Sequence, residues 1–152
     1  MKLVLFYSFL FSLLFLFSTE QISAQTDDLY KDGTVWNVTF IRTAANRTDD
    51  YLKGLAQTWA AMMEESKKEG LIVSYKILQG NSANKEDFDL MLMIEYKDFA
   101  SLDPDPTRDA KFDALEKKIK DQMGEKYQST ISNYSEIRDL LGSKLMREKH
   151  LK

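Results

Sequence analysis

Hydrophobic residues in this chain recur with two periodicities, one typical of strands and one typical of helices. The order of these two kinds of segment along the chain restricts the possible folds more than any other feature of the sequence. Stretches rich in β-branched and aromatic residues indicate strands, whereas apolar recurrence every three or four residues indicates helices. The expected elements are a strand at 34–42, a helix at 49–69, strands at 71–79 and 88–96, a helix that begins at 106 and ends at 124, helical turns within 125–141 and a strand at 144–151. Their order is strand, helix, strand, strand, helix, strand.

This order consists of two β-α-β units joined by a hairpin, which is the split βαβ or ferredoxin-like arrangement of the α+β class. Right-handed crossover connections place the helices on one face of a four-stranded antiparallel sheet. The other face of the sheet, called the open face below, then carries no helix. The domain is expected to occupy residues 34–152.

Acidic residues cluster around the start of the second predicted helix and allow two interpretations. The carboxylates of Asp98, Asp103, Asp105 and Asp109 are the kind of ligand that a hard cation such as calcium prefers. They lack the spacing and the glycine of an EF-hand loop, however, and Asp105 followed by Pro106 suits the N-cap and first turn of a helix. We therefore interpret the run as helix capping and predict no metal site.

The side-chain rows of two strands suggest what lies on the open face. In strand 88–96, Met91 and Met93 share a row with Glu95, and in strand 34–42, Asn37 shares a row with Thr39. We assign both rows to the open face, where their apolar members would form a patch that monomers seldom expose. These apolar members are Val35, Ile41, Met91 and Met93. The sheet of a second copy is expected to cover them.

The element order, the two-helix face and the closing segment LLGSKLMREKHL at 140–151 resemble a dimeric α/β-barrel domain. In that superfamily two ferredoxin-like subunits pack sheet against sheet, so the resemblance over residues 34–152 implies a homodimer. The superfamily includes cofactor-free monooxygenases, haem-handling enzymes, isomerases, cyclases and members with no known chemistry. It therefore implies no single reaction.

Glu95 is the candidate catalytic residue. Apolar neighbours on the open face would disfavour its charge and make it a stronger general base. Asn37 and Thr39 would orient a ligand through uncharged hydrogen bonds, and Lys76 or Arg147 would pair with Glu95. The predicted ligand-binding residues are Asn37, Thr39, Lys76, Met91, Met93 and Arg147.

Composition excludes several kinds of chemistry. The 152 residues include no cysteine and one histidine, His150, so thiol nucleophiles, disulfides and a Ser-His-Asp triad are excluded, and a haem ligand is disfavoured. The chain has 21 Lys and Arg residues against 24 Asp and Glu residues, which gives a net charge of −3. This charge does not indicate binding to nucleic acid. No cofactor is predicted.

The N-terminal segment has the pattern of a secretory signal peptide. Lys2 precedes an apolar run at 3–17, and Ser23 and Ala24 supply the small residues of a cleavage site. As a helix, the run would extend about 22 Å, short of the roughly 30 Å core of a bilayer. We predict a signal peptide at 1–24, a flexible leader at 25–33, and a secreted or periplasmic protein that is neither a lipoprotein nor a membrane protein.

Three functions remain open at this point. In the first, the chain is a non-catalytic dimer that binds a small, partly apolar molecule in a cavity between two sheets. In the second, it is a cofactor-independent enzyme of the monooxygenase or isomerase type, with Glu95 as the base and Asn37 orienting the substrate. In the third, it is a protein-interaction module that uses its helical face.

Overall fold

The secondary structure follows the predicted order in a computed structural model that describes residues 29–152. The predicted signal peptide at 1–24 and the first part of the predicted leader lie outside the described residues. The strands are β1 Tyr30–Thr43, β2 Ser74–Gln79, β3 Leu90–Tyr96 and β4 Arg138–Leu151. The helices are α2 Thr48–Gln57, α3 Trp59–Lys68, the 3-10 turn η2 Phe99–Leu102, α4 Pro106–Met123 and α5 Glu125–Ile137.

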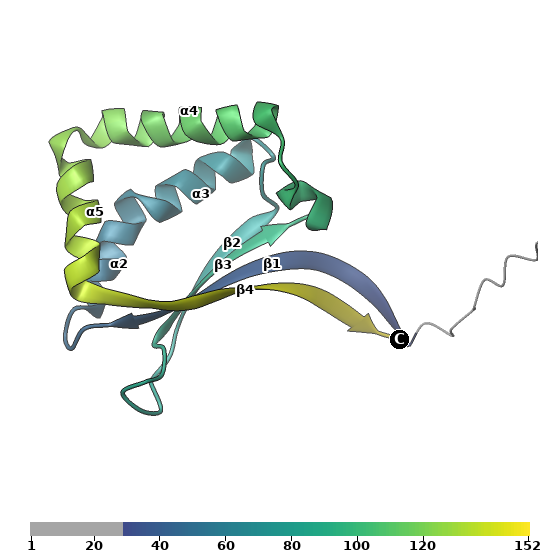
Figure 1. Cartoon of the computed structure of the whole chain (residues 1–152), viewed down its shortest axis with the longest axis horizontal. Coiled ribbons are helices and arrows are strands. Elements are labelled where there is room, and N and C mark those ends of the chain that lie inside the picture. Colours follow the sequence, from purple (N-terminus) through teal and green to yellow (C-terminus); the bar gives the residue numbers. More distant parts are fainter. Residues whose placement is uncertain (1–28) are drawn as a thin grey trace, which may run out of the picture.

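The strands form one antiparallel sheet in the order β2-β3-β1-β4. Helices α2 and α3 connect β1 to β2, and α4 and α5 connect β3 to β4. All four helices lie on one side of the sheet, with α4 running above α3 and α5 descending to β4 (Figure 1). The fold class is therefore α+β and ferredoxin-like, as predicted.

Strands β1 and β4 are longer than predicted and pair to their far ends. Tyr30 lies opposite Leu151, and the backbone N–H of Lys152 donates to the carbonyl of Leu29 at 3.2 Å. Residues 30–33, which the sequence places in the leader, therefore belong to β1. The two strands form a ribbon that extends past the helices toward the C-terminus (Figure 1).

Gly142 lies inside β4, although the sequence predicts that it separates helical turns from the last strand. Helix α5 ends at Ile137, and β4 begins at the next residue. The pairing register shifts between Phe40 and Ile41, opposite this part of β4, and Gly142 has a φ of +145°. Glycine tolerates that backbone angle, so it permits a bulge where another residue would be strained.

The predicted helix at 49–69 is bent at Thr58, which separates α2 from α3. The backbone N–H of Thr58 donates to the carbonyl of Gly54 at 3.1 Å, and its side-chain hydroxyl donates to the same carbonyl at 3.0 Å. Threonine hydroxyls that bond back to the preceding turn bend helices. The hydroxyl also contacts Tyr134 of α5, so the bend is held by tertiary packing.

Helix capping explains part of the acidic run, as predicted. The Asp105 carboxylate accepts from the backbone N–H groups of Thr107 at 2.9 Å and Arg108 at 3.1 Å at the start of α4. Asp98 accepts from the backbone N–H of Ser101 at 2.9 Å and caps η2. Within residues 29–152, no three histidine or acidic side chains are grouped so as to hold a metal ion.

The face assignment of strand β1 differs from the prediction. Asn37 lies opposite Ile94, Thr39 opposite Leu92, and Ile41 opposite Leu90. Ile41, Leu90 and Leu92 are buried in the core against α2 and α5, so their row faces the helices. The prediction that Val35, Asn37, Thr39 and Ile41 share the open face with Met91 and Met93 is therefore wrong. Alternation defines two rows within each strand, but the register between strands decides which rows share a face.

The open face carries the other row of each strand. Its apolar side chains are Trp36, Val38, Phe40, Leu78, Met91, Met93 and Met146. Leu78 remains 44% exposed and Met146 52% exposed. The ammonium groups of Lys76 and Lys144 lie over the Trp36 and Phe40 rings, 4.7 and 5.8 Å from their centroids, and partly cover them. None of the described helices is long and apolar enough to cross a bilayer.

Candidate functional site

A cavity of about 560 Å³ lies between the helices and the helix-facing side of the sheet. We call it the helix–sheet cavity. Strands β1, β3 and β4 contribute Thr39, Ile41, Leu92, Arg138 and Leu140 to its lining, and the helices contribute Tyr51, Leu55, Thr58, Trp59, Met62, Glu116, Ile119, Tyr127, Ile131, Tyr134 and Ser135. Most of these side chains are aromatic or aliphatic, which is typical of small-molecule sites.

Helical spacing brings the lining residues of α5 to one side of that helix. Tyr127, Ile131 and Tyr134 are separated by four and three residues, so they lie in one stripe. The same spacing continues to Arg138, the first residue of β4, whose backbone N–H donates to the Tyr134 carbonyl and closes the helix. Two tyrosines and one arginine from this stripe therefore line the cavity.

One buried polar group of the cavity is the pair formed by Tyr134 and Thr58. Their hydroxyl oxygens are 2.6 Å apart. Because Thr58 donates its proton to the Gly54 carbonyl, Tyr134 must donate to Thr58. Burial raises the pKa of Tyr134, and burial raises the pKa of the neighbouring Tyr51 to about 12, so both tyrosines are neutral at pH 7.

Arg138 supplies the positive charge of the cavity wall. The central carbon of its guanidinium is 5.6 Å from the ring centroids of both Tyr51 and Tyr134. Its Nε is buried and has no hydrogen-bond partner among residues 29–152. A buried donor left unsatisfied costs roughly 1–3 kcal/mol, and an acceptor atom in the cavity, from a ligand or from water, would remove this cost.

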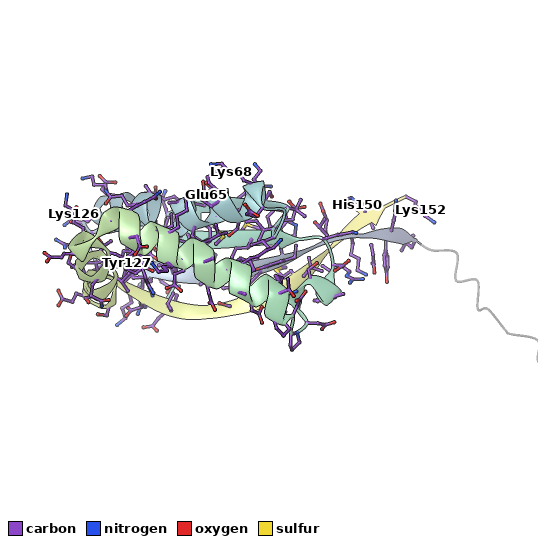
Figure 2. All side chains as sticks on the ribbon, turned by 90° about the horizontal axis from the view of Figure 1, so that it is seen from above. Glu65, Lys68, Lys126, Tyr127, His150 and Lys152 are labelled. Atoms are coloured by element: carbon purple, nitrogen blue, oxygen red, sulfur yellow. The ribbon has the colours of Figure 1, made fainter. Side chains whose placement is uncertain are left out.

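Glu116 supplies the negative charge of the wall, and a lysine balances it. The Lys120 ammonium lies 2.8 Å from the Glu116 carboxylate and lowers the pKa of that group through this hydrogen bond. The Tyr127 hydroxyl donates to the same carboxylate at 3.3 Å. Tyr127 lies where α5 begins, beside the end of α4 (Figure 2). Glu116 therefore has two partners of its own within the fold.

The structure divides the predicted site residues between the two faces of the sheet. Thr39 lines the helix–sheet cavity, and Asn37 lies on the same face next to Ile94. Arg147 lies opposite Val35, also on that face, and donates to Asp32 at 2.8 Å with its guanidinium over the Phe99 ring. The remaining predicted residues, Lys76, Met91, Met93 and Glu95, lie on the open face. The predicted set therefore does not form one site.

Glu95 is half-buried on the open face and is bound by hydroxyl groups. The Thr34 hydroxyl donates to its carboxylate at 2.8 Å, and the Ser74 hydroxyl donates to the other oxygen. Lys76 lies over Trp36 instead, and Arg147 is paired with Asp32, so neither forms an ion pair with Glu95 in the described part of the chain. The role of Glu95 as a base stays a prediction.

Comparisons with known proteins add little to this description. No protein-family model matches the chain, and a search of curated proteins returned no match. A solved dimeric ferredoxin-like protein from an uncultured marine organism is similar to it, with 12% sequence identity, a TM-score of 0.42, and coverage of 80% of this chain and 89% of that chain. We therefore base the fold class on the strand order of this chain: a small ferredoxin-like domain with a cavity between its helices and its sheet.

Proposed function

We propose that this protein binds a small, partly apolar molecule in the helix–sheet cavity. The observation that carries the proposal is the cavity itself, because its volume of about 560 Å³ lies within the range of ligand sites, roughly 300–1,000 Å³. Aromatic and aliphatic walls would bury the body of the ligand. A few polar groups, among them Thr39 and Arg138, would orient it.

The proposed site lies within one subunit rather than between two sheets. The sequence-based hypothesis locates the ligand on the open face, but that face is occupied by Trp36, Phe40 and the two methionines Met91 and Met93, with lysines over the aromatic rings. These side chains form a surface suited to packing. We therefore assign ligand binding to one face of the sheet and association to the other.

We propose in addition that the protein is a homodimer joined through its open face. Support comes from the apolar side chains on that face, several of which are exposed or half-exposed in the single chain, and from the rarity of such patches on monomers. A second sheet packed against the first would bury Leu78 and Met146 without involving the helices.

The enzyme hypothesis stays open, but the cavity does not support Glu95 as its base. Glu95, its proposed base, lies on the opposite face of the sheet from the cavity. Glu95→Gln keeps the shape of the side chain and removes its charge, so we expect it to leave ligand affinity unchanged. A large loss of affinity in this variant would instead locate the ligand on the open face.

A fluorescent probe and two matched variants test the proposed site. Dansylglycinamide is neutral and small enough for the cavity, and its emission rises and shifts to the blue in an apolar environment. Ser135 is exposed at the cavity lining, so Ser135→Trp should obstruct entry without overpacking the core. Ser132, exposed on the same helix but outside the lining, is the control position for Ser132→Trp.

We expect the unmodified protein and Ser132→Trp to bind the probe with similar affinity and Ser135→Trp to bind it at least about tenfold more weakly, which corresponds to 1.4 kcal/mol. Equal affinity in all three proteins would show that the probe binds elsewhere. Absence of a binding signal in the unmodified protein would overturn the proposed function.

A further inference from the structure

Arg138 differs from every other arginine in the described residues by having no ion pair there. Arg42 pairs with Asp139, Arg47 with Asp50, Arg108 with Asp109 and Arg147 with Asp32. Arg138 is also the arginine that lines the helix–sheet cavity. An always-charged guanidinium without a carboxylate is thus located where a ligand would lie.

The carboxylates near Arg138 already have other partners. Its neighbour in sequence, Asp139, accepts two hydrogen bonds from Arg42, at 2.9 and 3.3 Å. Glu116, the acidic residue of the cavity wall, is held by Lys120 and Tyr127. Arg138 therefore forms no ion pair with an acidic group within the described residues.

Two neutral aromatic residues lie beside Arg138. Tyr51 and Tyr134 present their rings to the guanidinium at 5.6 Å, and both keep their hydroxyl protons at neutral pH because burial raises their pKa values. Ring faces hold a cation in place and leave its N–H groups available. The Nε–H is such a group, since it is buried and without a partner.

We propose that the ligand of the helix–sheet cavity carries a carboxylate, and that the Arg138 guanidinium binds it. This inference rests on the proposed function and specifies its ligand class: a monocarboxylate on an apolar body. A guanidinium matches a carboxylate with two parallel hydrogen bonds, which fixes orientation as well as charge. The body of the ligand would pack on the aromatic and aliphatic wall formed by Trp59, Ile119 and Ile131.

Two probes that differ only in charge test the inference separately from the proposed function. Dansylglycine has the same body as dansylglycinamide but ends in a carboxylate. Its dissociation constant should be about tenfold to a hundredfold lower than that of the amide, the range expected for one charge-assisted contact. Arg138→Gln should remove this preference, so that the two probes bind this variant with similar affinity.

Three controls distinguish the loss of the Arg138 charge from a loss of folding. Arg138→Lys keeps the charge without the fork geometry, so it should retain part of the preference, and it provides a test if Arg138→Gln is poorly folded. Arg47→Gln removes a surface arginine whose partner is Asp50, and it should keep the full preference. Circular dichroism checks each variant for folding.

The possible outcomes distinguish the proposed function, the carboxylate inference and the assignment to Arg138. Equal affinity of the unmodified protein for the two probes would overturn the carboxylate inference while leaving the proposed function intact. A preference that persists undiminished in Arg138→Gln, or in Arg138→Lys if Arg138→Gln is poorly folded, would overturn the assignment to Arg138. Failure of both probes to bind would overturn the proposed function, and the inference with it.

Discussion

Gly54 shows how one missing side chain lets helices α2 and α5 approach each other. A Cβ atom at this position would lie 2.8 Å from Cε1 and 2.9 Å from the hydroxyl of Tyr134. Tyr134 cannot move away easily, because its ring packs edge-on against Tyr51 and its hydroxyl is bonded to Thr58. The close approach therefore supports the same residues that line the cavity.

Two effects of opposite sign decide the outcome of Gly54→Ala. Alanine favours a helix over glycine by about 1 kcal/mol, but overpacking a core costs about 1–3 kcal/mol. Because the clash is with a buried ring, we expect a net loss of up to about 2 kcal/mol in the free energy of unfolding, measured by urea denaturation. Gln57→Ala, at an exposed position of the same helix, is the control. A more stable Gly54→Ala would mean that Tyr134 can shift.

At the scale of the elements, the cap of α4 makes a pH-dependent contribution. The backbone N–H groups of Arg108 and Thr107 hold the pKa of Asp105 below its ordinary value. A carboxylate with a lowered pKa in the folded state stabilises the protein above the unfolded pKa, about 3.9, and this contribution disappears as the pH falls through the folded value. Stability should therefore decline in acid partly through this cap.

Asp105→Asn tests that contribution, because asparagine caps helices but does not titrate. Between about pH 5 and about pH 2, the free energy of unfolding should fall less in this variant than in the unmodified protein. Asp113→Asn, at an exposed position of the same helix, provides the control. Parallel curves for the unmodified protein and Asp105→Asn, measured by urea denaturation at several pH values, would contradict the expectation.

A comparison of the helices and strands with the sequence shows which features of the fold local sequence patterns predict. Local periodicity and capping chemistry predict the order of strands and helices, the cap at Asp105, and the placement of the helices on one face of the sheet. These predictions are confirmed. The face of Thr39 could not be read in this way, because the register between β1 and β3 depends on tertiary packing. The bend at Thr58 likewise depends on a contact with a distant helix.

The candidate site was only partly predictable for the same reason. The sequence predicts Thr39 as a ligand-binding residue on the open face, whereas the structure places it on the helix-facing side, in the lining of the cavity. The sequence analysis did not predict Arg138, because this residue lies at the junction where α5 ends and β4 begins. The signal that could have found it is the stripe of Tyr127, Ile131 and Tyr134, which continues to this arginine in the sequence.

For the whole molecule, Met93 lies at the centre of the proposed dimer interface. It is between Val38 on β1 and Lys76 on β2. A charge in a desolvated interface without a partner costs several kcal/mol, so Met93→Asp should dissociate the dimer. Sedimentation velocity at micromolar concentration should show a dimer for the unmodified protein and a monomer for this variant.

Leu145→Asp is the matched control, because Leu145 is exposed and lies opposite Asn37, on the helix-facing side of the sheet. It should remain dimeric. An unmodified protein that sediments as a monomer would contradict the proposed interface, and a Met93→Asp variant that stays dimeric would show that association does not depend on the open face.

We also propose that the chain is exported and that residues 1–24 are removed. The proposal rests on Lys2, the apolar run at 3–17 and the small residues Ser23 and Ala24. Intact-mass measurement of the exported fraction should give a chain that starts at Gln25. A mass that includes Met1 or Lys2 would contradict it.

The pairing of β1 with β4 has a consequence for the rate of folding. The longest ladder of the sheet joins the two ends of the domain, so its strands are separated by most of the domain in sequence, and contacts this distant in sequence slow folding. Leu29 and Lys152 are already hydrogen-bonded to each other. A circular permutant that links them through a short glycine segment, and opens instead in the exposed loop at 81–86, would convert that ladder into a local hairpin. The same sheet should then form faster from the same residues.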